Sequence, residues 1–354
     1  MKRGGLIIVP GWLVAVALSA AGVIQPRVVT EPVAHDSEDP AIWVNPADPA
    51  RSLILGTDKH AVDGALVVFD LEGKILPDKT VRGLDRPNNV DITTGFRLAG
   101  RRVDLAVVTE RNAGRLRAFT VPDMQPVDGG GLSVFEGDPE RLPMGIALYT
   151  RPRDGALFAI VSGRVGPPNG YLWQYRLEDD GHGVVRATKV RAFGRFSGRK
   201  EIESVAVDAE LGYVYCADEQ AGVRKYHADP EVSGADAELA LFATAGFAGD
   251  HEGISVFPTG PGTGYLLVSN QDGDTFEVFT REGMPGRPHD HRHVGSLQLS
   301  TRASDGHEVT AQATAPRFPG GLLVAMSHDR TFQFYAWAEL AAALQEIRTA
   351  EAKP

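Results

Sequence analysis

The same short pattern occurs six times in this sequence, and this repetition most limits the folds open to the chain. Each copy is a short apolar strand that ends in an aromatic residue and is bounded by glycine or polar residues. Two further strand-like runs precede each copy, and no copy contains a convincing helix. The pattern predicts an all-β fold, a six-bladed β-propeller. The aromatic residues recur every 50 to 56 positions: Phe69, Phe119, Tyr175, Tyr226, Phe279 and Tyr335.

We expect one propeller domain over residues 27–350. Because a propeller is a closed ring, its last blade needs an outer strand, and residues 27–33 are the candidate for it. Residues 338–350 are rich in Ala, Leu and Glu, which predicts a short C-terminal helix. A two-sheet sandwich or two separate β domains are the alternatives, and six in-phase copies without a linker argue against both.

Residues 1–24 have the composition of an export signal. Lys2 and Arg3 precede an apolar run from Leu6 to Ile24, and the small residues 19–21 offer a cleavage site. The run is just long enough to cross a membrane, so an uncleaved anchor is the alternative. We therefore expect the mature protein to be periplasmic or secreted.

The charge and cysteine content exclude several classes of protein. The chain has 46 acidic and 36 basic side chains, a net charge of −10, which disfavours nucleic-acid binding. An anionic ligand must then be held by a local basic patch or by bound cations. The single cysteine, Cys216, excludes an intrachain disulfide and a cysteine-based zinc site. We expect a monomer without a stable protein partner, since the pattern shows no large apolar surface.

Equivalent positions of the blades should meet at one rim of the ring. The position before the first strand of each repeat is mostly acidic: Asp39, Asn89, Met144, Glu203, Glu252 and Asp305. The position after the second strand carries Lys59, Arg111, Arg164, Glu219, Gln271 and the pair His328 and Asp329. Antiparallel pairing brings both positions to the same rim. We therefore expect a basic arc from blades one to three to face an oxygen-rich arc from blades four to six, which also includes Asp250.

Such a rim suits a polyanion held by basic side chains and metal ions together. Carboxylates this close repel one another unless a cation lies among them. Hard oxygen ligands favour Ca²⁺ over Mg²⁺ or Mn²⁺. Lysine and arginine bind phosphate directly, and a metal-activated water can attack a metal-bridged phosphate. The pattern predicts calcium-dependent phosphoester hydrolysis without a covalent enzyme intermediate.

Several stretches, in order and at blade spacing, resemble the β-propeller phytases, the calcium-dependent alkaline phytase family. The resemblance extends from about Glu31 to Trp337. The matching stretches are residues 38–43, 88–92, 155–159, 173–175, 250–253, 264–271 and 318–322.

The resemblance implies a 3-phytase-type enzyme that hydrolyses phytate, myo-inositol hexakisphosphate, presented as its calcium complex, to lower inositol phosphates. It implies several Ca²⁺ ions, and phosphate-binding roles for Lys59 and Arg111. The implied calcium ligands or their neighbours are Glu38, Asp39, Glu203, Glu219, Asp250, Glu252, Gln271 and Asp305. We predict Lys59, Arg111, Arg164 and Glu203 as the catalytic set, the first three also binding substrate.

The sequence departs from the family at several of these positions. Arg164 stands where the family often has lysine, Met144 where a tyrosine is common, and Glu38 where the family has aspartate. The loop at residues 327–330 is reduced, which puts one structural calcium of the family in doubt. The alternatives are a propeller phosphatase for another phosphoester and a non-catalytic calcium-binding propeller scaffold. A calcium-dependent lactonase-type propeller is the third.

Overall fold

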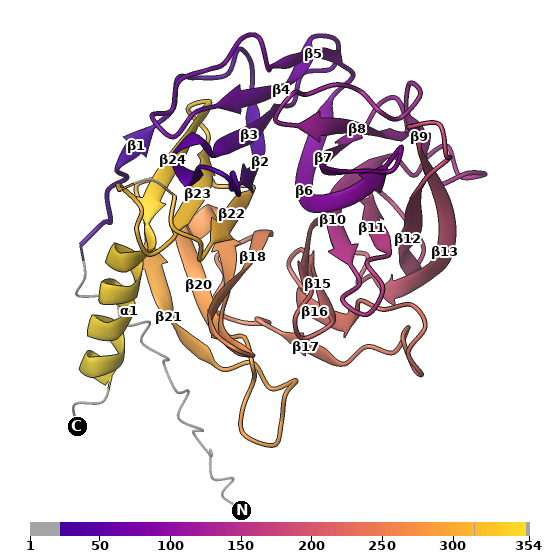
Figure 1. Cartoon of the computed structure of the whole chain (residues 1–354). Coiled ribbons are helices and arrows are strands. Elements are labelled where there is room, and N and C mark those ends of the chain that lie inside the picture. The colour runs from indigo at the N-terminus through magenta and orange to yellow at the C-terminus, as the bar shows by residue number, and fades with distance from the viewer. Residues whose placement is uncertain (1–21, 315, 352–354) are drawn as a thin grey trace, which may run out of the picture.

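Six four-stranded antiparallel sheets follow one another around a ring in chain order (Figure 1). The structure is a computed structural model that describes residues 22–314 and 316–351. The predicted export signal lies almost entirely outside the described residues. The six-bladed propeller predicted from the repeat is confirmed.

The first five blades are each built from consecutive strands. Blade one contains β2 (Ser37–Trp43), β3 (Leu53–Asp58), β4 (Gly64–Phe69) and β5 (Val81–Leu84). Blade two contains β6 (Pro87–Leu98), β7 (Arg101–Glu110), β8 (Arg115–Val121) and β9 (Leu132–Ser133). Blade three contains β10 (Pro143–Thr150), β11 (Leu157–Gly163), β12 (Asn169–Asp179) and β13 (Val185–Arg195). Blade four contains β14 (Ile202–Asp208), β15 (Tyr213–Asp218), β16 (Gly222–His227) and β17 (Ala240–Phe242). Blade five contains β18 (His251–Gly260), β19 (Thr263–Asn270), β20 (Thr275–Thr280) and β21 (His293–Gln298).

The sixth blade joins the two ends of the described chain. Its inner strands are β22 (His307–Thr310), β23 (Leu322–Ser327) and β24 (Thr331–Ala336). The outermost strand is β1 (Val28–Val29), which pairs antiparallel with β24. Residues 27–33 were the candidate for this closing strand, and two of them form it. The ring is thereby closed by hydrogen bonds between strands some 300 residues apart in the sequence.

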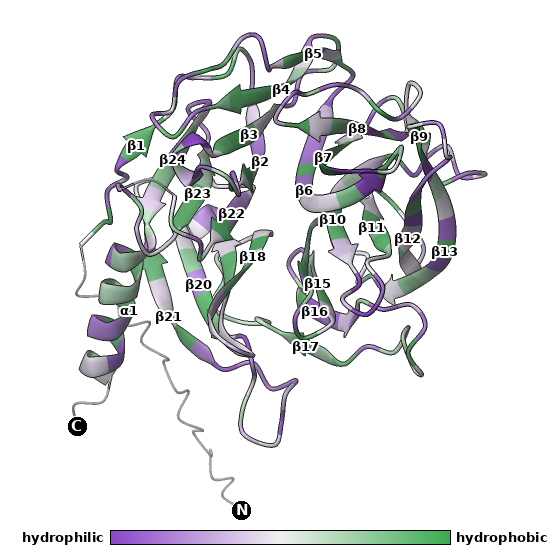
Figure 2. Ribbon diagram, viewed as in Figure 1, coloured by the Kyte–Doolittle hydropathy of each residue, from purple (hydrophilic) through white to green (hydrophobic). Residues whose placement is uncertain are grey.

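The repeated aromatic residues hold the blades together. All six, from Phe69 to Tyr335, are buried, and each packs in an apolar layer against the preceding blade. There is one such layer between each pair of neighbouring blades, and Figure 2 shows apolar residues concentrated on strands such as β3 and β4. β3 and β23 are buried along their whole length, because both faces of each sheet are covered.

The predicted C-terminal helix is present as α1 (Trp337–Glu351). Leu340 and Leu344 are buried in the layer between blades five and six, and Trp337 stacks on Phe257 with ring centroids 3.4 Å apart. Two short 3₁₀ turns, Pro49–Arg51 and Gln271–Gly273, complete the helical elements of the described residues.

None of the helices in residues 22–314 and 316–351 has the length and apolar character needed to cross a membrane.

Candidate active site

Five of the six innermost strands carry a β-bulge at the same place, close to one rim of the ring. In blade one, for example, the register is interrupted between Ser37 and Pro40. A bulge places two residues opposite one on the partner strand and re-aims their side chains. The first bulge residues are Glu38, Asn88, Met144, Glu203 and Glu252.

The bulges correct the alignment of the repeats proposed from sequence. Asp39 and Asn89 were grouped with Glu203, but strand pairing makes Glu38 and Asn88 the equivalents of Glu203. Asp39 takes the second bulge position, and its carboxylate accepts a hydrogen bond from the Val90 amide at 3.0 Å. The structure therefore separates Glu38 at the mouth from Asp39, which lines the central channel.

The central channel is acidic below the mouth. Asp39, Asp91 and Glu308 line one cavity there. Burial raises the pKa of Asp91 to about 6 and that of Glu308 to about 8. Of the three, only Asp39 occupies the rim position of its repeat in the sequence, because Asp91 and Glu308 lie within strands β6 and β22.

Side-chain hydroxyls fix the bulges from blade to blade. Thr109 accepts a hydrogen bond from the Asn89 amide at 3.0 Å and donates one to the Met144 carbonyl of the next blade at 2.7 Å. Thr57 and Ser269 make the same two kinds of bond. Each of these hydroxyl residues lies two positions before the rim residue that follows the second strand. Their regular spacing in the repeats could therefore have identified them from the sequence.

Lys59 stands on the basic side of the mouth, directly after β3. Its ammonium contacts the buried carboxylate of Glu38 and lies 3.3 Å from Asp305 Oδ2. Burial opposes its charge, but the negative charges of Glu38 and Asp305 outweigh this and raise the pKa of Lys59. Lys59 therefore remains an ammonium at any physiological pH.

Arg111 and Asn88 connect the basic side to the acidic side. Arg111 is buried, and its Nη1 donates to Asn88 Oδ1 at 3.3 Å. Asn88 Nδ2 in turn donates to Glu38 Oε1 at 3.0 Å and to Glu203 Oε1 at 2.6 Å. Burial, with the nearby charge of Arg86, lowers the pKa of Arg111. The Asn88 side chain thus holds the Glu38 and Glu203 carboxylates together.

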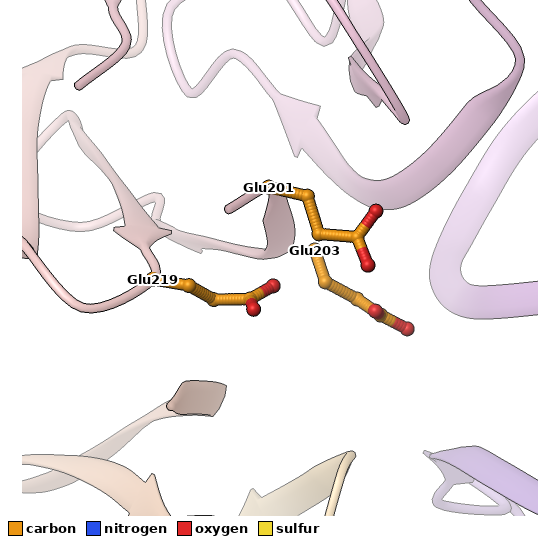
Figure 3. A group of neighbouring side chains, drawn as sticks. All are labelled: Glu201, Glu203 and Glu219. Carbon is orange, nitrogen blue, oxygen red and sulfur yellow. The ribbon is translucent and has the colours of Figure 1, made fainter. Parts of the chain in front are cut away.

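Two groups of three carboxylates form the acidic side, and Glu219 belongs to both. Glu201, Glu203 and Glu219 each offer an oxygen within 4.8 Å of the others, and Figure 3 shows the three side chains close together. Glu201 directly precedes β14, Glu203 lies at the start of that strand, and Glu219 follows the end of β15. Glu219, Asp250 and Glu252 form the second group with the same spacing.

The chemistry of these groups fits a hard metal cation. Oε1 of Glu219 and Oε2 of Glu252 are buried and accept no hydrogen bond, whereas Oε2 of Glu219 lies 2.8 Å from the Lys200 ammonium. Burial raises the pKa of Glu219 to about 8 and holds that of Glu252 well above its usual range. Buried carboxylate oxygens without donors are the ligands that Ca²⁺, Mg²⁺ and Mn²⁺ accept.

The structure brings most of the predicted residues to one mouth. Arg164 follows β11 on the same rim and is exposed, whereas Met144 is buried. Gln271 donates a hydrogen bond to Asp305. Lys200 and Glu201 also lie there and were missed, because they precede β14 in a loop that has no counterpart in the repeat register. The predicted residues gathered at the mouth are Lys59, Arg111, Glu38, Glu203, Glu219, Asp250, Glu252, Gln271 and Asp305.

Fold and site together define a β-propeller whose mouth carries basic side chains beside groups of carboxylates with the spacing of metal ligands. The family model described as Phytase matches residues 13–336, and the chain belongs to the phytase family. It is accordingly a phosphoric monoester hydrolase.

Two known proteins show how far the likeness extends. The chain is 28% identical to a 3-phytase of Bacillus subtilis (strain 168) over 356 aligned positions, which cover 90% of this chain and 84% of that protein. Among solved structures it resembles Kuenenia stuttgartiensis hydrazine synthase, with a TM-score of 0.51 over 84% of this chain and 82% of that one. At 14% identity the second likeness concerns the fold alone.

Proposed function

We propose that this enzyme is a calcium-dependent 3-phytase-type phosphomonoesterase that hydrolyses phytate to lower inositol phosphates and phosphate. The observation that carries the proposal is the presence, at one mouth, of Lys59 and Arg111 beside carboxylates that include buried oxygens without a hydrogen-bond donor. Phytate is a compact polyanion, and a protein of net charge −10 with an acidic mouth repels it unless cations intervene. This supports the calcium complex of phytate as the form that binds.

Glu201, Glu203 and Glu219 would hold one calcium ion, and Glu219, Asp250 and Glu252 another. Calcium in these places supplies positive charge to the phosphate oxygens and a water of lowered pKa. The number of carboxylates at the mouth is consistent with several bound calcium ions.

The chain's own groups bind and orient the substrate. Lys59, fixed by Glu38 and Asp305, presents an ammonium to phosphate oxygens, and Arg111 presents a planar guanidinium anchored on Asn88. Glu203 Oε1 accepts a hydrogen bond from Asn88, and we assign to the Glu203 carboxylate the role of accepting the proton of the attacking water. Water attacks phosphorus directly, without a covalent enzyme intermediate, as the bond between phosphorus and the inositol oxygen breaks. The leaving oxygen takes up a proton from solvent, so the products are phosphate and a lower inositol phosphate.

We also propose that the protein is exported, periplasmic or secreted, and monomeric. The basic start and the apolar run of residues 6–24 support export. Detection of the mature chain outside the cytoplasm, beginning near residue 25, tests the first point, and light scattering tests the second.

Substrate and metal are tested together by measuring phosphate release from phytate, glucose 6-phosphate and p-nitrophenyl phosphate, each in Ca²⁺, Mg²⁺ or EDTA. We expect release from phytate in Ca²⁺, loss of this activity in EDTA, and much slower release from the two monophosphates. Equal release from a monophosphate would contradict the phytate assignment, and full activity in EDTA would contradict the calcium assignment.

A further inference from the structure

Lys200 places an ammonium inside the Glu219, Asp250 and Glu252 group. Its Nζ lies 2.8 Å from Glu219 Oε2 and 3.6 Å from Glu252 Oε1, and it contacts Asp250 Oδ2. These are the three residues whose oxygens lie within 4.8 Å of one another. The ammonium therefore lies where a metal ion bound by this group would lie.

Lys200 reaches this position from solvent, unlike the residues around it. It belongs to the loop between β13 and β14, and its side chain is 39% exposed, whereas those of Glu219 and Asp250 are 0% and 12% exposed. Lysine carries its charge on a flexible four-carbon stem. The ammonium can leave the group by rotation of this stem, with no change in the strands.

The ammonium satisfies the group incompletely. One positive charge faces three carboxylates, and Glu252 Oε2 still has no donor. A calcium ion accepts six to eight oxygen ligands, so it would also engage the carboxylate oxygens that Lys200 does not contact. Two cations at this separation repel strongly in a partly buried site, and both would need the same oxygens.

We propose that Lys200 is a tethered cation that competes with a divalent metal ion for the Glu219, Asp250 and Glu252 group and is displaced when the ion binds. The inference rests on the proposed binding of calcium at the mouth. It adds a regulatory consequence: Lys200 neutralises the group when calcium is scarce, and it raises the calcium concentration at which the site fills. Arg199, the preceding residue, is exposed and bonds the Gln220 carbonyl instead, so it does not share this role.

The test is calcium binding to the full-length, chelator-treated protein by isothermal titration calorimetry, with thermal melting in EDTA and in Ca²⁺. Lys200→Met removes the ammonium and keeps the stem, and Arg199→Met is the control for loss of one positive charge in the same loop. We expect Lys200→Met to bind at least one calcium ion about tenfold more tightly than the wild type. It should also melt lower in EDTA and gain more from calcium. Arg199→Met should change affinity by less than about twofold.

Each other result counts against the inference in a distinguishable way. If the wild type binds calcium and Lys200→Met binds it equally or more weakly, Lys200 does not compete, and the proposed calcium site stands. If neither protein takes up calcium or gains stability from it, both the inference and the calcium part of the proposed function are wrong. Lys200→Gln, which retains a polar head, provides the same comparison should Lys200→Met be isolated unfolded.

Discussion

The Glu219→Gln substitution should stabilise the metal-free protein and destabilise the protein when calcium is added. Glu219 is completely buried, belongs to both carboxylate groups, and burial raises its pKa to about 8 from an ordinary value of 4.5. Between these two values the unfolded chain releases the proton and the folded chain keeps it. The free energy of unfolding therefore falls as the pH rises from about 4.5 to about 8 in the metal-free protein.

The magnitude follows from the size of this pKa difference. At about 1.4 kcal/mol per unit, the ionisable side chain costs the metal-free protein roughly 4 kcal/mol at pH 8. A buried glutamine amide carries its own cost of roughly 1–3 kcal/mol where it lacks partners. Glu219→Gln should thus stabilise the metal-free protein by about 2 kcal/mol. With calcium the sign should reverse, because the variant loses a ligand of both proposed calcium ions. A hundredfold loss of affinity would remove up to about 2.7 kcal/mol of linked stabilisation.

The assay is calorimetric melting of wild type and Glu219→Gln at pH 8, in EDTA and in millimolar Ca²⁺. Glu178→Gln, at an exposed position on β12, is the matched control and should change neither melting temperature appreciably. The reasoning is refuted if Glu219→Gln lowers the melting temperature by the same amount in both conditions.

Three further predictions concern the mouth and the core. Arg111→Lys should lower kcat/KM for phytate by about tenfold, because a point charge replaces a planar fork, and an unchanged kcat/KM would exclude Arg111 from phosphate binding. Thr109→Val should lower the free energy of unfolding by about 2 kcal/mol in urea titrations, since the amide of Asn89 and the carbonyl of Met144 lose their shared hydroxyl. Burial lowers the pKa of Lys225 to about 8, so wild-type stability should rise by up to about 3 kcal/mol between pH 8 and 10.5. Lys225→Met should abolish that rise, and an unchanged pH profile would contradict the assignment.

The fold was predictable because the repeat and the core share one cause. Each blade must bury both faces, and the aromatic residue that closes its third strand fills the layer against the preceding blade. Phe69 and Phe119 therefore recur at blade spacing in the sequence and occupy equivalent places in the structure. The short closing strand β1 was predictable because the propeller is a closed ring. Without β1, the last blade would have no outer strand and β24 would lack a pairing partner on that side.

The site was only partly predictable, for two physical reasons. The residues that follow the second strands, such as Lys59 and Glu219, were aligned correctly because those strands pair regularly with the third strands up to their ends. The inner strands contain bulges, and the extra residue of a bulge cannot be recognised from the types of residue around it. The sequence alignment therefore put Asp39 at the position that Glu38 occupies in the structure. Lys200 reaches the mouth through its side-chain length from a loop outside the repeat, so no periodic pattern could include it.

The central claim is that basic side chains and calcium act together at one mouth to hydrolyse phytate. Its most direct test is the initial rate of phosphate release from phytate, measured across a calcium titration for the wild type, Lys59→Met and the exposed control Lys74→Met. The account predicts no release without calcium, a rise with calcium in the wild type and in Lys74→Met, and a loss of at least about a hundredfold in Lys59→Met at every calcium concentration. Wild-type release that is independent of calcium, or a Lys59→Met enzyme as active as the control, would contradict it.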